Sequence, residues 1–389
     1  MQILFLSAWH PYPPDNGARL RNFHLLNGIS EFHDITLLTF SEKDRFGDRS
    51  ELEKICSKVG IVPKKDYDSK SRQAILGYLS SKPRVLVDRY VPEMTQLIEN
   101  ELSGGKFDLV IASEIYMADY LSTSFTVPAI FEQVEVGVFT DAVTKSDNLI
   151  RRTRNQLTLS KLKTYFQDLL PRFANCTVVS REEKELLLEL VPSYKNLEVI
   201  PNGVSLASYR KVQENPQPGK LIFTGALTFE PNFKAMEWFS SQVLPKVKQS
   251  NPEVQLVITG NHGGRKLSDD ANISLVGYVD DIRPMISSAW ISIAPIFSGG
   301  GTRLKILEAF GLRTPVIATS KGAEGLEVQH GKHLLIADSV EAFAHETTRL
   351  LIDEDLRYEL TENAYRLTKE KYDWQVIIPK FLSLIEAAV

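Results

Sequence analysis

The segment WISIAPIFSGGGTRLKILEAF, residues 290–310, joins an apolar run, three consecutive glycines and an amphipathic stretch. The apolar run 290–295 predicts a buried strand, and the apolar spacing after the glycines predicts a helix that starts near Thr302. Glycines between a strand and a helix let main-chain N–H groups approach a ligand, and the helix N-terminus favours an anion. The segment therefore predicts an α/β fold with an anion site at the carboxyl end of a parallel strand.

Short apolar runs of the same kind recur along the whole chain, spaced too widely for hairpins. The first series covers residues 2–7, 35–40, 108–113, 127–131 and 176–180. The second series covers residues 197–201, 220–225, 254–260, 273–277, 290–295, 314–319 and 333–337. Apolar runs that alternate with helical patterns are typical of parallel strands joined by crossover helices. The sequence therefore predicts an α/β protein with two Rossmann-like, doubly wound parallel-sheet domains.

The domain boundaries follow from the length and from one polar segment. A chain of 389 residues favours two or three domains. The segment 205–220 is polar and contains Pro and Gly, so it reads as a linker. We expect an N-terminal domain over 1–204 and a C-terminal domain over 205–370. Residues 371–389 are expected to form a C-terminal helix that packs back on the N-terminal domain.

The composition excludes several classes of protein. The chain is 43% hydrophobic and 24% charged, as in ordinary globular proteins, and its net charge of −4 argues against a nucleic-acid partner. Its two cysteines, Cys56 and Cys176, lack metal-ligand spacing and read as reduced thiols. With no secretory pattern after Met1 and no apolar run of about 18 residues, we expect a cytoplasmic protein.

The charged residues after the glycines suggest which anion binds. Arg303 and Lys305 would oppose the dipole of the predicted helix, so a bound anion would compensate their charge. Glu308 shares a helical face with Leu304 and Leu307, and a carboxylate there needs hydrogen-bond donors, such as the two hydroxyls of a ribose. The alternative is an i,i+3 pair of Lys305 with Glu308 on a solvated helix, with the glycines as a flexible turn.

Four motifs in order resemble glycosyltransferase family 4, the sugar-nucleotide-dependent enzymes of the GT-B fold in bacterial envelope polysaccharide synthesis. They are VIPNGV (199–204), TGALTFEPNFKAMEWF (224–239), LVGYVDDIRP (275–284) and GGGTRLKILEAFGLRTPVIATSKGAEGL (299–326). The resemblance is strong over the second half of the chain and weak over the first. It implies two domains that face a central cleft, with the donor bound by the C-terminal domain and the acceptor by the N-terminal one.

The resemblance assigns roles within the opening segment. Glu308 matches the second glutamate of the family's E-x7-E motif, which holds the nucleotide ribose. The first glutamate, which contacts the transferred sugar, falls at Gly300, so that carboxylate is missing. The backbone of Gly300, Gly301, Thr302 and Arg303 is expected to line the sugar and the diphosphate.

A second glycine-containing strand end, at Gly225, resembles the family's donor-phosphate loop. The family often has an arginine and a lysine after this glycine, but here the corresponding residues are neutral and include Asn232. Lys305 and Arg303 are therefore expected to neutralise the diphosphate, and we count both among the candidate catalytic residues.

Further donor contacts are expected from two other loops. His262 follows a third glycine-containing strand end and either touches the donor or lies in a surface loop. Tyr278 and Val279 resemble the segment whose backbone reads the nucleobase. Asp280 and Asp281 could suggest a metal, but a solvated turn with a helix N-cap is favoured. The resemblance implies neither a metal nor a cofactor beyond the UDP-sugar substrate.

The N-terminal domain carries one glycine-containing loop, HPYPPDNGARLRNFHLL (10–26). Gly17 is expected to approach the donor, as in the family's glycine loop, with Arg19 and Arg21 nearby. The alternative is a Pro-rich surface loop with two solvated arginines. Because no G-x-G-x-x-G is present, a nicotinamide dehydrogenase is not supported.

The segment EQVEVGVFTDA (132–142) follows another predicted strand. The resemblance places Gln133 where family members commonly have a histidine near the anomeric carbon. Glu132 and Glu135 flank it, and either carboxylate could act as a base or stabilise a glycosyl cation. The alternative is a pair of surface acids.

The basic segment 149–166 reads as a solvated helix face or as an amphipathic helix on an anionic membrane surface, which would suit a polyisoprenoid-linked acceptor.

The resemblance implies a glycosyltransferase that moves a sugar to a carbohydrate or lipid-linked hydroxyl, and the basic segment adds the alternative of a peripheral contact with the inner membrane face. By resemblance the donor is UDP-glucose and the reaction retains configuration. The alternatives are a UDP-sugar epimerase of the same fold and a non-catalytic sugar-nucleotide-binding subunit.

Overall fold

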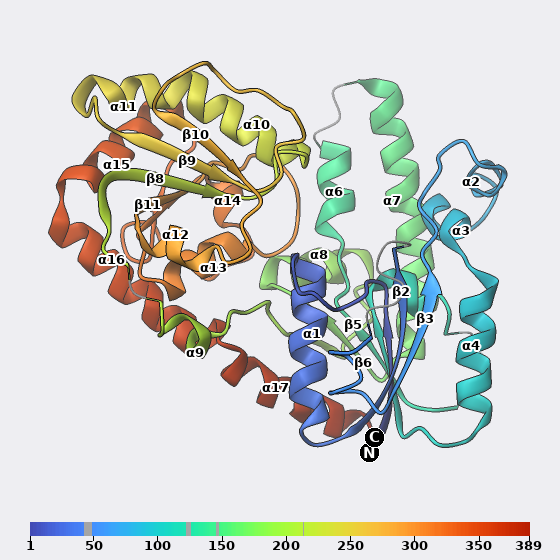
Figure 1. Cartoon of the computed structure of the whole chain (residues 1–389). Coiled ribbons are helices and arrows are strands. Elements are labelled where there is room, and N and C mark those ends of the chain that lie inside the picture. Colours follow the sequence, from blue (N-terminus) through green and yellow to red (C-terminus); the bar gives the residue numbers. More distant parts are fainter. Residues whose placement is uncertain (43–48, 122–125, 145–147, 213) are drawn as a thin grey trace. The chain divides into compact units, whose positions relative to one another are not determined.

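A computed structural model describes residues 1–42, 49–121, 126–144, 148–212 and 214–389. The chain forms two compact units (Figure 1). The first unit comprises Met1–Pro201 and Ile378–Val389, and the second comprises Asn202–Ile377. The division between Pro201 and Asn202 thus lies slightly before the domain boundary predicted at residue 204.

The first unit is built on a sheet of seven described strands in the order β3-β2-β1-β4-β5-β6-β7, all paired in parallel. The strands are β1 (Gln2–Ser7), β2 (Asp34–Ser41), β3 (Lys58–Pro63), β4 (Leu109–Ser113), β5 (Ala129–Glu132), β6 (Asn175–Val178) and β7 (Leu197–Val199). The chain order of the strands reverses between β1 and β4. In doubly wound sheets this point marks the crevice where ligands bind.

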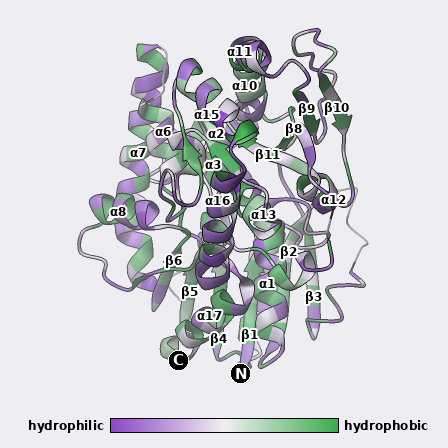
Figure 2. Cartoon of the chain, turned by 90° about the vertical axis from the view of Figure 1, so that its left-hand side faces the viewer, coloured by the Kyte–Doolittle hydropathy of each residue, from purple (hydrophilic) through white to green (hydrophobic). Residues whose placement is uncertain are grey.

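Helices flank this sheet, with α1 and α4 on opposite sides of it in Figure 1. The helices are α1 (Gly17–Ser30), α2 (Arg72–Leu76), α3 (Arg84–Arg89), α4 (Pro92–Ser103), α5 (Glu114–Ala118), α6 (Gly137–Thr144), α7 (Leu149–Leu169) and α8 (Arg181–Leu190), with a short 3₁₀ helix at Leu170–Arg172. Asn16 caps α1 by accepting from the backbone N–H of Arg19 at 3.1 Å. The largely hydrophilic helix α7 buries only its C-terminal half, through Leu162, Phe166 and Leu169 among others (Figure 2).

The second unit is built on six described parallel strands in the order β10-β9-β8-β11-β12-β13. They are β8 (Gln217–Thr224), β9 (Gln255–Thr259), β10 (Ile273–Gly277), β11 (Ala289–Ala294), β12 (Val316–Ala318) and β13 (Leu335–Ile336). On β8, Leu221 and Phe223 pack into one apolar cluster and Ile222 into another, so both faces of the sheet are buried. The strand order reverses between β8 and β11.

The helices of this unit lie on both faces of its sheet. They are α9 (Leu206–Tyr209), α10 (Glu230–Trp238), α11 (Leu244–Ser250), α12 (Arg283–Ser287), α13 (Leu304–Gly311), α14 (Ser320–Ala323), α15 (Val340–Ile352), α16 (Glu354–Leu367) and α17 (Trp374–Ala388), with π-helical turns at Phe239–Val243 and Thr368–Tyr372. The chain returns to the first unit between Ile377 and Ile378, which lie inside α17. Beyond this point, Ile378 lies against Gly28 and the Lys380 amine donates to the Val199 carbonyl at 2.7 Å, so α17 ends within the first unit.

The predicted fold class is confirmed, and the structure differs from the predicted elements in three places. Strand β3 was not predicted, because Gly60 interrupts its apolar run. The predicted linker 205–220 instead contains α9 and the first half of β8, and the side chain of Leu206 in α9 is buried in the core of the second unit. Helix α13 starts at Leu304 rather than near Thr302, with Arg303 as its N-cap residue.

Candidate functional site

Glycines with left-handed backbone stand at the ends of three strands of the second unit or directly after them. We call these glycines, together with the loop 299–301, the glycine-lined edge. Gly225, Gly260 and Gly277 have φ angles of 145°, 96° and 82°. The N–H of Gly260 donates to the carbonyl of Gly277 at 2.7 Å, and a Cβ on Gly260 would lie 2.6 Å from the backbone nitrogen of Ala226. Only glycine therefore allows these loops to approach each other so closely.

The loop 299–301 after β11 is held by the side chain that follows it. Gly299 and Gly301 have φ angles of 94° and 81°. The Arg303 guanidinium donates to the carbonyls of Gly299 at 2.6 Å and Gly300 at 3.1 Å. Arg303 thus fixes the loop conformation while adding positive charge beside it. Its predicted contact with the diphosphate stays a prediction.

Lys305 lies at the centre of the glycine-lined edge. Its amine donates to the Asn232 side-chain oxygen at 3.2 Å, lies 3.9 Å from the ring centroid of Phe223, and would lie 3.2 Å from a Cβ on Gly225. Burial, and then the charge of Arg303, lower the pKa of Lys305 to about 7. Lys305 forms no ion pair among the described residues, so a bound anion would supply the missing counter-charge.

Glu308 lies one helical turn after Lys305 but does not pair with it. The carboxylate is partly buried, and neither a hydrogen bond nor an ion pair is formed by it in the described part of the chain. Burial raises the pKa of Glu308, and the charge of Lys305 opposes that shift. The predicted alternative of a solvated i,i+3 pair is therefore wrong for this conformation. The carboxylate is available to accept hydrogen bonds from a ligand.

The other residues predicted to contact the donor are His262, Tyr278, Val279 and Thr302. His262 is half-buried in the turn after β9, where its Nδ1 accepts from the Gly264 N–H at 3.3 Å. That turn packs on the loop after β8, because the Leu227 N–H donates to the Asn261 carbonyl at 2.9 Å. Tyr278 is 69% exposed, and Val279 beside it is half-buried. Thr302 has a buried hydroxyl that lacks a hydrogen-bond partner among the described residues.

The paired acids after β10 are used locally. Asp281 accepts from the Arg283 side chain at 2.7 Å, and this hydrogen bond holds the pKa of Asp281 below its usual value. Over the described ranges, His, Cys, Asp and Glu side chains form no group of three or more that is arranged to hold a metal ion. The predicted independence of metal and cofactor stays a prediction.

In the first unit, two predicted site residues form a buried ion pair. Arg21 Nε donates to Glu132 at 2.6 Å, and both side chains are 0% exposed. Arg21 also donates to the carbonyls of Ile200 and Pro201, and the Ser113 hydroxyl donates to Glu132 at 2.8 Å. The predicted alternatives of solvated arginines and surface acids are therefore wrong for this pair. Glu132 is a positioning residue rather than an accessible base.

The Gly17 loop is also organised by ion pairs. Gly17 is the first residue of α1, two residues before the buried Arg19. Arg19 pairs with Asp15 at 2.9 Å and with Glu42 at 3.4 Å. The predicted approach of Gly17 to the donor stays a prediction.

Gln133 and Glu135 lie together after β5. Gln133 has a left-handed backbone with φ of 60°, which strains a non-glycine residue and is often found at functional sites. Its amide donates to Glu135 at 2.8 Å, while its buried side-chain oxygen lacks a partner among the described residues. Burial raises the pKa of Glu135, and the Gln133 hydrogen bond opposes that shift. Of the two predicted carboxylates, Glu135 has the more suitable environment for proton transfer.

The sequence prediction missed a third acid of this cluster, Glu114. It directly follows β4, has a φ of 68°, and accepts from the Trp9 indole N–H at 3.1 Å. Burial, followed by the like charge of Glu135, raises the pKa of Glu114 to about 8. A carboxyl group with a pKa near neutrality can give or take a proton. The sequence signal that could have identified Glu114 was the position of an acid directly after the apolar run 108–113.

The sequence comparisons point to glycosyl transfer. Residues 218–353 match the family model described as glycosyl transferases group 1. The chain is 26% identical over 313 residues to a phosphatidyl-myo-inositol mannosyltransferase of Mycobacterium tuberculosis, covering 77% of this chain and 78% of that one. It is 24% identical over 396 residues to an uncharacterized 44.6 kDa protein in the cps region of Klebsiella pneumoniae, covering 96% of each.

A solved structure has the same fold. HepE of Anabaena, in complex with UDP and glucose, superposes with a TM-score of 0.66 at 15% sequence identity, covering 100% of both chains. The two doubly wound sheets and this likeness establish the GT-B fold. Among the described helices, none combines the length and the apolar character needed to cross a membrane.

Proposed function

We propose that this chain, a glycosyltransferase with the GT-B fold, transfers glucose from UDP-glucose to a hydroxyl acceptor in polysaccharide or glycolipid synthesis, with retention of configuration. The observation that carries the proposal is the glycine-lined edge with Lys305 at its centre and no protein carboxylate paired to that lysine in the described residues. The choice of UDP-glucose rests on the resemblance to family 4 and on the UDP and glucose bound to HepE.

The second unit would bind the UDP moiety through three kinds of contact. Backbone N–H groups of the glycine loops face a diphosphate without interference from Cβ atoms. Lys305 gains a counter-ion, and its charged form then stabilises the departing UDP. Glu308 accepts hydrogen bonds from the ribose hydroxyls, which satisfies a carboxylate that has no protein donor in the described chain.

Neutralisation of the diphosphate by Lys305 and the loop amides would require no metal ion. We therefore propose that activity survives EDTA. Loss of activity on chelation, with recovery on adding Mg²⁺ or Mn²⁺, would contradict this part of the proposal and would direct attention to Asp280, which is exposed beside the glycine-lined edge.

On the acceptor side, the relatives favour a lipid-linked or polysaccharide acceptor, since one is named as a phosphatidyl-myo-inositol mannosyltransferase and another lies in a cps region. Leu149 and Ile150 at the start of α7 are 82% and 84% exposed and precede the exposed Arg151 and Arg152. This combination suits a peripheral contact with an anionic membrane, which we include in the proposal.

The first test is a thermal-shift panel of nucleotide sugars followed by a UDP-release assay. Binding at a hundredfold excess over the dissociation constant stabilises a protein by about 2.7 kcal/mol. We expect UDP and UDP-glucose to raise the melting temperature, and UDP release to require an acceptor. No shift with any nucleotide sugar would refute the proposal. Conversion of the donor sugar without acceptor would favour the epimerase, and binding without any turnover would favour the non-catalytic subunit.

A further inference from the structure

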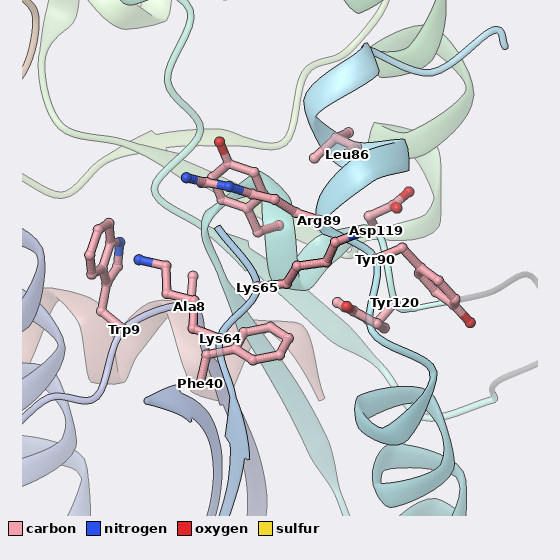
Figure 3. A pocket seen from close by; sticks show the side chains of 11 residues that line it. Ala8, Trp9, Phe40, Lys64, Lys65, Leu86, Arg89, Tyr90, Asp119 and Tyr120 are labelled. Atoms are coloured by element: carbon pink, nitrogen blue, oxygen red, sulfur yellow. The ribbon is translucent and has the colours of Figure 1, made fainter. Parts of the chain in front are cut away.

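The first unit contains a pocket at the carboxyl ends of four neighbouring strands (Figure 3). Trp9 follows β1, Phe40 lies near the end of β2, Lys64 follows β3, and Tyr116 lies in α5 directly after β4. This is the edge at which open α/β sheets bind ligands. We call this site the Lys64 pocket.

Two cations of the Lys64 pocket have no carboxylate partner among the described residues. The Lys64 amine points toward the Trp9 ring in Figure 3 and lies 3.2 Å from its centroid. The Arg89 guanidinium carbon lies 4.9 Å from the centroid of the Tyr116 ring. Within the same ranges the buried Nε of Arg89 has no hydrogen-bond partner. Both cations therefore rest on aromatic faces, which only partly replace a counter-ion.

Two nearby acids are already engaged with other groups. Asp88 pairs with Lys65 at 3.3 Å, and Asp119, which also lines the pocket, pairs with Lys82 at 2.6 Å. Burial lowers the pKa of Lys64, and the like charge of Arg89 lowers it further, while Glu42, Asp66 and Glu114 oppose that shift. A bound anion would compensate the desolvation cost of Lys64 and offset its repulsion by Arg89.

The remaining wall of the Lys64 pocket is aromatic. Tyr90 and Tyr120 stack with their ring centroids 5.4 Å apart, and the Tyr120 hydroxyl accepts from the Val91 N–H at 2.9 Å, which fixes this pair. The Trp9 ring is fixed by its hydrogen bond to Glu114. Rigid rings offer flat apolar faces that fit the C–H face of a pyranose. The pocket thus combines a surface for a sugar ring with two cations.

We propose that the Lys64 pocket binds the acceptor, and that this acceptor is a sugar carrying a phosphate group held between Lys64 and Arg89. This inference rests on the proposed glycosyl transfer. A phosphate group carries a charge of about −1.5 to −2 at pH 7, which matches two cations, whereas a carboxylate would leave one of them uncompensated. The planar guanidinium of Arg89 can donate two parallel hydrogen bonds to phosphate oxygens.

The test compares phosphorylated sugars with their neutral parents on the full-length protein by calorimetry. The probes are glucose 6-phosphate, glucose 1-phosphate, mannose 6-phosphate, the parent sugars, glucuronate and a short-chain prenyl diphosphate-linked glucose. We expect at least one phosphorylated probe to bind tenfold or more tightly than its parent sugar. Equal affinity within every pair, tighter binding of glucuronate, or no binding of any phosphorylated probe would overturn the proposal.

The same probes distinguish the two sources of the phosphate. Binding of a free sugar phosphate and its use as an acceptor would indicate a soluble phosphosugar. Binding and use of only the prenyl-linked probe would indicate a lipid-linked acceptor. Both results support the recognition of phosphate by the Lys64 pocket.

Variants connect the effect to the two cations. We expect Lys64→Met and Arg89→Met each to weaken binding of the phosphorylated probe tenfold or more, while Lys106→Met, at an exposed lysine of the same unit, leaves it unchanged. UDP affinity should be unchanged in all three, and an unchanged unfolding transition of the first unit verifies that the variants fold. Unchanged binding of the phosphorylated probe in both pocket variants would overturn the proposal. If UDP itself fails to bind the wild type, the proposed function fails independently of this pocket.

Discussion

The glycine-lined edge of the second unit and the acidic cluster of the first unit (Glu114, Glu132 and Glu135) occupy equivalent places at the carboxyl ends of parallel strands. They are built in opposite ways. The first consists of backbone bent into left-handed conformations, with a single partly buried lysine. The second consists of side chains, among them a fully buried ion pair and two carboxyl groups with raised pKa values.

This difference shows how each region can recognise a ligand. Backbone N–H groups and one cation suit a diphosphate, whose charge and shape are the same whatever sugar it carries. Side chains in specific protonation states suit a reacting hydroxyl and can vary with the acceptor. The following predictions separate the two regions, in order of decreasing effect.

The largest effect is expected from breaking the buried pair of the first unit. Arg21→Met leaves Glu132 buried without its cation, which costs about 3–5 kcal/mol of stability in comparable pairs. Denaturant unfolding of the full chain should show this loss in the transition of the first unit. The double variant Arg21→Met with Glu132→Leu should recover much of it. A single-variant loss below about 1 kcal/mol would show that the pair is not a structural element.

The next effect is expected at Lys305. Lys305→Met removes a charge-assisted contact worth about 1.5–3 kcal/mol, so UDP affinity should fall roughly tenfold to a hundredfold. The unliganded protein should not be destabilised, because a partly buried charge with no ion-pair partner among the described residues is replaced by an apolar chain of similar length. Calorimetry with UDP and thermal melts of both proteins measure the two effects.

The pH dependence of UDP binding tests the same lysine. Its pKa is about 7 in the free protein, and a bound anion would raise it. Below pH 7 the Lys305 amine is charged both in the free protein and in the UDP complex, so it adds no pH dependence to UDP binding. Above pH 7 binding must take up a proton, so UDP affinity should fall with rising pH until the pKa of the complex is passed. This fall should be absent in Lys305→Met, and its absence in the wild type would argue against the contact.

A matched pair of glycine variants measures the close approach of the loops. Gly260→Ala places a methyl group 2.6 Å from the backbone of Ala226, whereas Gly331→Ala, with a similar φ of 73°, meets no atom within 4 Å. Both variants carry the strain of left-handed backbone, but only the first adds a steric clash of about 1–3 kcal/mol. We expect Gly260→Ala to melt lower than Gly331→Ala and to bind UDP more weakly. Equal behaviour would mean that the loops adjust freely.

The smallest effect is expected from Glu308→Gln, which keeps the shape of the side chain and removes its charge. UDP affinity should fall about tenfold, the equivalent of 1.4 kcal/mol. The control is a UDP analogue that lacks both ribose hydroxyls, whose affinity should be the same for the wild type and the variant. If the affinities for UDP and for the analogue fall equally in the variant, Glu308 does not contact the ribose hydroxyls.

The sequence predicted the glycine-lined edge well because its components are local. Gly225, the glycines 299–301, Lys305 and Glu308 stand at regular positions after apolar runs, and the chain order of strand, glycine loop and helix already implies their place. What it missed was the partner of each charge. Nothing in the sequence linked Lys305 to Asn232, although the two side chains share a hydrogen bond in the structure.

The first unit shows the opposite outcome. Arg21 and Glu132 are 111 positions apart, and only the parallel sheet brings their side chains within 2.6 Å. Glu114 was overlooked because an acid after a strand is common and its environment comes from Trp9, far away in the sequence. The sequence assigned no role to Lys64 or Arg89, and strand β3 before Lys64 was not predicted.

The amino-acid sequence by itself determined two doubly wound α/β domains and the place of the glycine loops after their strands, because hydrophobic periodicity and glycine spacing act over a few residues. Only the tertiary structure decided which charges are buried, which are paired and which lack a partner. The reason is physical: the free energy of a buried charge depends on its desolvation and on the nearest opposite charge. In this chain both are set by residues that neighbouring parallel strands bring together from distant parts of the sequence.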